Sequence, residues 1–466
     1  MNLMGIDIGT TSIKTAVFNE NLEEISSSVA DYTLETKGDI VEFDAEQYWE
    51  ITRNEILGAK SKNGIMDAIA VDTQCETLIL TDENGTPVRK AIVWLDNRAT
   101  EETEIIEKHF GRKKVYEITG QPEITATWPA CKLLWVKRHE PEVWAKTKKI
   151  FLLEDYILYK MTGKFVSEKT LQSSTIYFDI KKAQWWDEML DFISVSKDML
   201  PELVGSGVCV GEFDEAKVVT SAIDQIAGAI GAGVIKKGIV SEMTGTTMVI
   251  FMPSDNVPEY DEASIVPCHY NYDDKYCLLS WSPTAGMALK WFKNAFCEDL
   301  SFKEIDEMAE KIAPGCDGVT FLPYLCGSTM PKYNPKARAS FTGITPEHGR
   351  AHFARAVMES VSCMLKSNLD YLKLDVAEIR AMGGGAKSPL WCGIKADMTG
   401  KTLVTLKNNE TACLGSAILA GVGAGVFESV EEAAKKIEVD KVYKPTGTDY
   451  TEAYNRYLEY DKILNV

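Results

Sequence analysis

A short pattern that occurs twice constrains the fold of this chain more than any other feature. Residues 3–6 are mostly apolar, the loop DIGTTS (residues 7–12) follows, and residues 13–18 are again rich in apolar side chains. About half the chain later, residues 239–251 repeat this design around the tetrapeptide TGTT. Each copy predicts two strands joined by a tight turn. Repetition at half-chain spacing predicts two duplicated domains.

The length of the chain also indicates more than one domain, because 466 residues exceed what a single hydrophobic core usually holds. We predict domains at residues 1–236 and 237–466, with a hinge near residues 234–240. In a cleft between two such domains, one turn from each side would hold opposite ends of a shared ligand.

The first turn has the composition of a phosphate-binding loop. Gly9 lets the backbone approach a ligand closely, and the hydroxyl groups of Thr10 and Thr11 are donors for phosphate oxygens. Lys14 would add a positive charge, and Asp7, at the end of the strand, is placed to hold Mg²⁺ through water. The simpler alternative is a favourable chain reversal without a ligand.

The second turn lacks the acidic residue, since a methionine and a threonine stand where the first copy has Asp7 and Ile8. One carboxylate facing a metal is sufficient, and a second would repel phosphate. We therefore predict that the second turn also binds phosphates, through Thr244, Gly245, Thr246 and Thr247.

A glycine-rich turn supplies a third element in the C-terminal half. Residues 378–382 predict a strand and residues 389–398 a helix, with glycines between them. Bare backbone there lets a flat ring such as adenine, with its ribose, lie close. Such turns are common in α/β folds, so this prediction gains weight from the two Gly-Thr-Thr turns. The residues concerned are Gly383, Gly384, Gly385 and Ala386.

One carboxylate is a candidate catalytic base. Transfer of a phosphoryl group to a hydroxyl needs positioning, charge neutralisation and a carboxylate that accepts the hydroxyl proton. Asp224 begins a stretch of small residues that predicts a helix at the close of the first half. A helix N-terminus stabilises a carboxylate, so the alternative role of Asp224 is that of an N-cap.

The three elements, in this order and spacing, resemble the phosphate 1, phosphate 2 and adenosine motifs of the superfamily that joins actin, the heat-shock chaperone ATPases and the sugar kinases. The segments ASFTGI (339–344) and HFARAVME (352–359) resemble the C-terminal signature of the FGGY carbohydrate kinases. PACKLLWV (129–136) is similar to the N-terminal signature of that family, although Thr127 departs from it. The resemblance implies an α/β fold of duplicated ribonuclease H-like (actin-like ATPase) domains with a cleft between them, and it implies ATP and Mg²⁺ as cofactors.

The resemblance also implies roles for individual residues. The segment AIDQIAGA (222–229) is similar to the stretch that carries the catalytic base of the family, with Ile223 and Gly228 departing from it. Asp224 would then take the proton from the attacking hydroxyl. Trp94 and Trp128 would form an apolar wall along the sugar, although a tryptophan alone is more often part of a core. The sugar-binding residues that we expect are Gln74, Glu76, Trp94, Trp128 and Gln225.

Two adjacent residues bear on the substrate. Glycerol kinases carry arginine before the acidic residue and xylulokinases a Met-His pair, whereas this chain has Cys75 and Glu76. A thiol cannot replace a guanidinium fork. The resemblance therefore implies a phosphotransferase acting on a hydroxyl of a neutral sugar or polyol, with a ketopentose such as xylulose favoured and a glycerol- or erythritol-type polyol as the alternative. An actin-like or chaperone-like ATPase and a sugar-binding regulator without turnover are less favoured.

Composition argues against several other classes of protein. A formal charge of −19 disfavours nucleic-acid binding, and the five histidines lack metal-ligand spacing. Eleven cysteines without a Cys-x-x-Cys pair indicate reduced thiols in a cytoplasm, and we expect neither a secretory signal nor a membrane span. The expected partner is a small sugar or polyol, with no nucleic acid and no membrane, and a homodimer is the assembly that we consider.

Three further segments are expected to form scaffold. Residues 151–163 predict a helix and residues 173–180 a strand, both in the first domain. Residues 411–427 predict a helix rich in glycine and alanine, suited to packing closely beneath a nucleotide.

Overall fold

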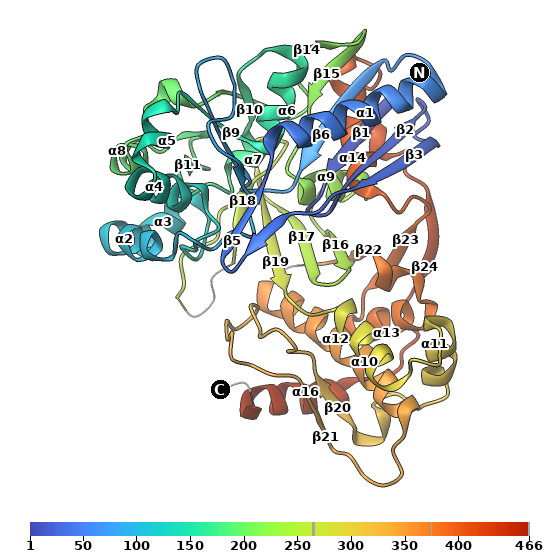
Figure 1. Ribbon diagram of the computed structural model, residues 1–466. Helices are drawn as coiled ribbons and strands as arrows, with labels where there is room; N and C mark the ends of the chain where they lie inside the picture. The colour runs from blue at the N-terminus through green and yellow to red at the C-terminus, as the bar shows by residue number, and fades with distance from the viewer. Residues whose placement is uncertain (263–265, 374, 465–466) are drawn as a thin grey trace. The chain divides into compact units, whose positions relative to one another are not determined.

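The computed structural model describes residues 1–262, 266–373 and 375–464 (Figure 1). The chain forms two compact units, and each is discontinuous in sequence. The first unit comprises Met1–Ile235, Ser254–Cys277 and Glu410–Ile437. The second comprises Lys236–Pro253, Leu278–Asn409 and Glu438–Val466. The predicted boundary at residues 236/237 lies beside the first of these junctions, whereas two segments of the second half belong to the first unit.

The main sheet of the first unit has the strand order β14-β15-β6-β1-β2-β3. Its strands are β14 (Cys209–Phe213), β15 (Ala216–Thr220), β6 (Ala68–Thr73), β1 (Leu3–Ile8), β2 (Ser12–Phe18) and β3 (Glu24–Asp31). The helices beside it are α1 (Ala45–Asn63), α6 (Leu153–Thr162), α9 (Asp224–Gly231), α14 (Thr411–Ala424) and α15 (Val430–Ala434). All of β6 is buried, as expected for a parallel strand covered on both faces.

Glycines let helix α14 approach the backbone of its neighbours. A Cβ atom on Gly5 of β1 would lie 1.8 Å from the carbonyl oxygen of Cys413, and a Cβ on Gly415 would lie 1.8 Å from that of Ala227 in α9. Backbone contact of this kind requires glycine. Since side chains alternate along a strand, Asp7 shares the α14 face of β1 with Gly5, whereas Met4, Ile6 and Ile8 enter the core beneath α1 and α6.

A second sheet of the first unit has the order β4-β5-β8-β7-β9. Its strands are β4 (Glu35–Lys37), β5 (Ile40–Phe43), β8 (Ala91–Ile92), β7 (Leu78–Thr81) and β9 (Lys149–Leu152). A core of its own joins this sheet to the helices α2 (Thr100–Phe110), α3 (Arg112–Thr119), α4 (Pro129–His139), α5 (Pro141–Lys146) and α8 (Asp187–Ile193). The remaining short elements are β10 (Val166–Glu168), α7 (Lys169–Gln172), β11 (Phe178–Asp179), β12 (Gln184–Trp185), a 3₁₀ turn at Lys197–Met199, β13 (Glu202–Val204) and β18 (Cys268–Tyr270).

Two local predictions in this unit need correction. The helix predicted at residues 151–163 is α6, and its first two residues belong instead to β9. The strand predicted at residues 173–180 is wrong except for Phe178–Asp179. The hydroxyl groups of Ser173, Ser174 and Thr175 donate to carbonyl oxygens three residues earlier, so the chain continues from α7 in turns and bends before it reaches β11.

The sheet of the second unit contains the order β19-β17-β16-β22-β23-β24. Its strands are β19 (Tyr276–Ser282), β17 (Met248–Ser254), β16 (Ile239–Thr244), β22 (Glu378–Met382), β23 (Thr402–Leu406) and β24 (Val439–Tyr443). Its helices are α10 (Gly286–Phe296), α11 (Phe302–Glu310), α12 (Arg350–Leu372), α13 (Pro389–Thr399) and α16 (Thr451–Leu464), with 3₁₀ turns at Cys316–Gly318 and Gly384–Lys387. A two-stranded sheet, β20 (Thr320–Leu322) and β21 (Ser340–Thr342), packs against α12.

The two main sheets repeat one arrangement, which confirms the predicted duplication of an α/β fold. In the first unit β1 is antiparallel to β2 and parallel to β6, and β6 is parallel to β15. In the second, β16 is antiparallel to β17 and parallel to β22, and β22 is parallel to β23. Both Gly-Thr-Thr segments form hairpin turns, as predicted. Among the described residues no helix is long and apolar enough to cross a membrane.

Candidate functional site

Three carboxylates gather where β1, β6 and α9 meet in the first unit. Asp7 and Asp72 are direct neighbours on the parallel strands β1 and β6, and Asp224 is the first residue of α9. Burial, together with the nearby charge of Asp7, raises the pKa of Asp224 to about 7. Burial likewise raises the pKa of Asp7 and of Asp72 above their usual range. Sequence analysis missed Asp72, which is fully buried.

The two carboxylate oxygens of Asp224 differ in their hydrogen bonds. Oδ1 accepts hydrogen bonds from the backbone N–H of Gln225 at 2.8 Å and from the thiol of Cys75 at 3.3 Å. Oδ2 receives no hydrogen bond from any described residue. A carboxylate whose pKa is near neutrality and whose second oxygen is open has the properties of a general base. The alternative role of Asp224 as a simple N-cap does not hold, because Ile223 is the N-cap and Asp224 is the first residue of the helix.

Glu76 lies beside this base in a strained turn. Its φ of 55° is in the left-handed region, which a residue with a side chain seldom adopts and which marks sites of functional interest. Burial raises the pKa of Glu76, the charge of Asp224 raises it further, and the ammonium group of Lys132 opposes both. The carboxyl group of Glu76 therefore has a strong tendency to carry a proton.

Lys132 of α4 holds the turn at Glu76 through hydrogen bonds to main-chain carbonyl oxygens. Sequence analysis did not select it as a functional residue. The side chain is fully buried, and Nζ donates to the carbonyl oxygens of Val93 at 2.9 Å and Glu76 at 3.4 Å. Burial lowers the pKa of Lys132, while Glu76 raises it. The signal in the sequence is a lysine within the apolar run PACKLLWV, where a charge needs buried partners.

The other predicted sugar-binding residues occupy different surroundings. The amide nitrogen of Gln74 donates to the hydroxyls of Tyr48 and Tyr32, while its Oε1 is buried without a partner among the described residues. Gln225 lies next to Cys75, with Oε1 at 3.4 Å from the thiol sulfur. The indole N–H of Trp128 donates to the carbonyl oxygen of Glu123 at 2.7 Å, and its ring packs against the core of the second sheet.

The first Gly-Thr-Thr turn is tied to its surroundings in several ways. The N–H of Gly9 donates to Ser12 O at 3.0 Å, so it closes the turn and is not available to a ligand. Thr10 Oγ1 accepts a hydrogen bond from the indole N–H of Trp94 at 3.0 Å, and the carbonyl oxygen of Thr11 accepts one from the backbone of Tyr32 at 3.0 Å. The remaining predicted group, Lys14, forms an ion pair with Glu410 at 2.8 Å.

The second Gly-Thr-Thr turn and the glycine triplet lie against each other in the second unit. A Cβ on Gly383 would lie 2.8 Å from Thr244 O, and a Cβ on Gly385 would lie 2.7 Å from the side chain of Thr244. The start of α10 also packs on this turn, because the N–H groups of Gly286 and Met287 donate to the carbonyl oxygens of Gly245 and Thr246. Thr247 closes the turn by accepting from the N–H of Gly245. The glycine triplet leads into the 3₁₀ turn Gly384–Lys387, which includes Ala386.

The hydroxyl group of Thr244 is bonded within the protein. Its buried hydroxyl donates to Glu242 and accepts from Lys395 Nζ at 2.7 Å, and Lys395 forms an ion pair with Glu242 at 2.9 Å. All three side chains are fully buried. This group anchors β16 to α13, and only the main chain of Thr244 is left for any contact with phosphate.

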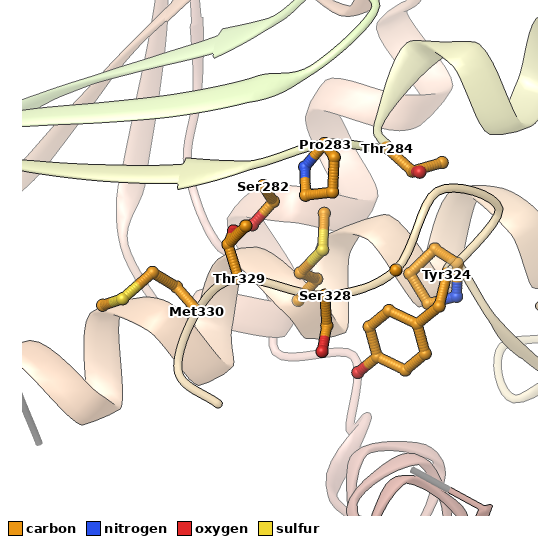
Figure 2. A pocket seen from close by; sticks show the side chains of 10 residues that line it. Ser282, Pro283, Thr284, Tyr324, Ser328, Thr329 and Met330 are labelled. Carbon is orange, nitrogen blue, oxygen red and sulfur yellow. The ribbon is translucent and has the colours of Figure 1, made fainter. Parts of the chain in front are cut away.

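A small pocket lies in the second unit near the start of α10 (Figure 2). Its empty volume is about 170 Å³, which is below the range usual for cofactor sites, and no residue predicted to bind ATP or sugar lines it. Pro283 and Thr284, which precede α10, lie across from the loop that carries Tyr324, Ser328 and Met330 (Figure 2). The pocket adjoins the second Gly-Thr-Thr turn without including it, since Thr284 directly precedes Ala285, whose N–H donates to Thr246 O at 3.0 Å.

One group of side chains has the spacing of metal ligands. Within the described parts of the chain, Glu101, Glu102 and His139 bring ligand atoms within 4.8 Å of one another. Arg138 pairs with both carboxylates, at 2.7 Å in the case of Glu101. The guanidinium group therefore already occupies both carboxylates and offsets part of the negative charge that would attract a metal.

Comparisons with known proteins agree over nearly the whole chain. The N-terminal domain of the FGGY family of carbohydrate kinases matches residues 2–233, and the C-terminal domain matches residues 243–424. The xylulose kinase of Staphylococcus epidermidis (strain ATCC 35984) is 30% identical, over 99% of this chain and 96% of the relative. The crystal structure of ligand-bound xylulose kinase from Lactobacillus acidophilus superposes with a TM-score of 0.93 at 25% identity, covering 100% of this chain and 98% of that one. The structure of gluconate kinase from Lactobacillus acidophilus gives 0.92 at 26% identity, covering 99% and 98%.

Proposed function

Because the chain belongs to the FGGY family of carbohydrate kinases, which transfer a phosphoryl group to an alcohol, we propose that it phosphorylates a hydroxyl of a ketopentose, with xylulose as the preferred substrate and ATP as the donor. The xylulose kinases that match the chain over nearly its full length support this substrate. The observation that carries the proposal is Asp224, a carboxylate with one oxygen held and the other open beside Glu76.

Asp224 acts as the base in this proposal. Its open oxygen, Oδ2, accepts the proton of the attacking hydroxyl while that hydroxyl oxygen bonds to the γ-phosphorus, and ADP departs with the electrons of the broken P–O bond. The pKa of about 7 suits a group that must be ionised to start and must hold a proton afterwards. Glu76 and the amide of Gln225 provide hydrogen-bonding groups for the remaining hydroxyls.

The charge of the site supports a neutral substrate over a sugar acid. Asp7 and Asp224 are acidic, whereas Glu76 tends to carry a proton, and the ammonium group of Lys132 is directed at main-chain carbonyl oxygens. The carboxylate of gluconate would meet like charge here. The gluconate kinase structure makes this sugar acid the second candidate, and a glycerol- or erythritol-type polyol is the third.

For the nucleotide, we assign the phosphates to the two Gly-Thr-Thr turns and the adenine and ribose to residues 383–386. Thr10 supports this role, since its hydroxyl oxygen already accepts from Trp94 and its own O–H is left to donate. In the second turn, Thr246 would provide the side-chain hydroxyl, and Thr244 would contribute through its main chain.

Mg²⁺ fits the acidic end of β1 and β6. Asp72 Oδ1 is buried without a hydrogen-bond partner among the described residues, and Asp7 is its neighbour on the next strand, so acceptor oxygens outnumber donors. Carboxylate oxygens are the ligands that Mg²⁺ prefers. We propose that Asp7 holds the ion through water. When bound, the ion would neutralise charge on the phosphates.

We also propose a cellular compartment and an oligomeric state for the enzyme. All eleven cysteines are unpaired in the structure, which supports a reducing compartment such as the cytoplasm. The homodimer stays a prediction that analytical ultracentrifugation tests.

The role of Asp224 is tested by Asp224→Asn, which keeps the shape of the side chain and removes the base. We expect kcat for sugar phosphorylation to fall about 100- to 10,000-fold with little change in the KM for sugar. A coupled assay of ADP release measures both. Asp44→Asn, at the N-cap of α1, is the matched control and should behave as wild type, since asparagine caps helices equally well. Near-normal turnover by Asp224→Asn would remove the proposed base.

The substrate is tested by comparing kcat/KM for xylulose, gluconate, glycerol and erythritol with the wild-type protein. We expect the highest value for xylulose and the lowest for gluconate. A higher value for gluconate than for xylulose would contradict the charge argument.

A further inference from the structure

We propose that Cys75 is a positioning residue for the base: its thiol holds Oδ1 of Asp224, so that Oδ2 is presented to the sugar hydroxyl. This inference rests on the proposed function, in which Asp224 accepts the hydroxyl proton. Cys75 follows β6 and lies across from the first turn of α9, with its sulfur 3.3 Å from Oδ1. It is a buried side chain with 8% of its surface exposed.

The thiol is a donor in this arrangement. Burial raises the pKa of Cys75 well above the ordinary range, and the charges of Asp224 and Glu76 raise it further, so the sulfur keeps its proton. A carboxylate oxygen has only acceptor capacity when ionised, so the S–H group must donate to it. Together with the N–H of Gln225, the thiol fixes one carboxylate oxygen from two directions.

A second acceptor lies within reach of the same thiol. Oε1 of Gln225 is 3.4 Å from the sulfur, slightly farther than Oδ1 of Asp224. One proton cannot serve both acceptors fully. The ionised carboxylate is the stronger acceptor, so the thiol favours Asp224 before the reaction. Once Oδ2 has taken the hydroxyl proton, the carboxyl group is neutral and the thiol is free to turn to Gln225.

The backbone on both sides of Cys75 holds it in place. The N–H of Gln74 donates to Ile8 O at 2.8 Å, and the amide group of Gln74 is held by Tyr48 and Tyr32. On the other side, Glu76 adopts the left-handed conformation. A strained backbone that is fixed from outside is a recurrent way to aim a side chain in an active site.

The charged groups that face Asp224 make the thiol more important. Asp7 from β1 carries the charge that disfavours an ionised Asp224, and Asp72 from β6 and Glu76 from the following turn are carboxyl groups whose own pKa the charge of Asp224 raises. Among the described residues, Cys75 and the backbone of Gln225 are the donors that favour the ionised form of this base. Loss of the thiol proton donor should therefore make the base harder to ionise.

The experiment compares Cys75→Ala and Cys75→Ser in the full-length protein by the pH dependence of kcat/KM for xylulose. In the wild type we expect the rate to rise with pH through about 7, as Asp224 loses its proton. Cys75→Ala should move the midpoint upward by about half a pH unit and lower kcat several-fold, with a smaller change in the KM for sugar. Cys75→Ser restores a donor and should return the midpoint to the wild-type value or below.

Controls separate this inference from a folding defect and from failure of the proposed base. Cys363→Ala removes a buried thiol that contacts Met398 in the second unit and should leave the pH profile unchanged. If Cys75→Ala does not fold, Cys75→Val fills the site without a donor and should give the same upward shift. A folded Cys75→Ala or Cys75→Val with the wild-type midpoint overturns the inference. Turnover by Asp224→Asn would instead reject the proposed base itself.

Discussion

Trp94 has a role that its residue type does not reveal. The sequence suggests an aromatic wall for the sugar, whereas the structure also joins its indole N–H to the hydroxyl oxygen of Thr10 in the first Gly-Thr-Thr turn. A hydroxyl that accepts a hydrogen bond can direct its proton elsewhere. Trp94 therefore orients the donor that we assign to a phosphate oxygen.

Trp94→Phe tests this orientation, because it keeps an aromatic ring and removes the donor. We expect kcat/KM for ATP to fall about two- to tenfold, the value of one hydrogen bond. Initial rates at varied ATP concentration measure the effect. Trp186→Phe is the matched control, since its indole N–H donates to Glu188 Oε2, outside the predicted site, and its loss should leave kcat/KM for ATP unchanged. Equal losses in the two variants would argue against a specific role for the Thr10 contact.

At the scale of residues, the sequence predicts which side chains belong to the candidate site better than it predicts their hydrogen-bond partners. Glu76 is distant in sequence from the adjacent pair Asp224 and Gln225, and all three lie together around Cys75. Lys132 and Asp72 escaped notice because their importance comes from burial among polar atoms, which no periodicity in the sequence records. The sequence also does not show where a hydroxyl group points. Thr244 was expected to bind phosphate, but its side chain bonds to the buried ion pair of Glu242 and Lys395.

At the scale of elements, glycine decides how closely helices approach one another. Gly415 of α14 contacts the backbone of α9 directly, whereas Gly393 of α13 has open space where its side chain would be. The two helical glycines are therefore expected to respond in opposite ways to the same substitution.

We expect Gly415→Ala to lower the free energy of unfolding by about 3 kcal/mol or more, because the added methyl group would overlap the carbonyl oxygen of Ala227 and force the helices apart. Gly393→Ala should raise the free energy of unfolding by up to about 1 kcal/mol, since alanine favours the helix. Urea unfolding followed by circular dichroism measures both. A mild effect at Gly415 would mean that α14 adjusts its position at little cost.

Elements with a clear pattern were predicted well, and those built from side-chain hydrogen bonds were not. Both hairpins and the strand before the glycine triplet follow from apolar runs bounded by Gly and Thr. The segment 173–180 looked extended, yet its hydroxyl groups bond to the preceding turn. Such local competition between side chain and backbone is invisible to periodicity.

At the scale of the whole molecule, contiguity in sequence is a poor guide to the compact units. The segment Glu410–Ile437 packs with Met1–Ile235, because α14 covers the face of β1 that carries Gly5. The sequence suggested a helix here and placed it beneath the nucleotide in the second domain. No local signal states which sheet a small-residue helix will cover.

A fragment of residues 1–235 should therefore not fold stably. Without α14, the α14-facing side of β1 and β6 would be exposed to water, and the apolar area lost from burial is a large part of what stabilises the sheet. We expect no cooperative thermal transition by circular dichroism, in contrast to the full-length protein. A sharp transition in the fragment would show that α14 is dispensable for the first unit.

The place of α14 in the chain also sets the order of events during synthesis. The strand Leu3–Ile8 leaves the ribosome first, and Thr411–Ala424, which covers it, is made roughly 400 residues later. At 5–20 residues per second, that strand waits on the order of 20 to 80 s for its covering helix. A nascent chain of this design has an apolar surface open for much of translation, which is a suitable substrate for chaperones that bind at the ribosome.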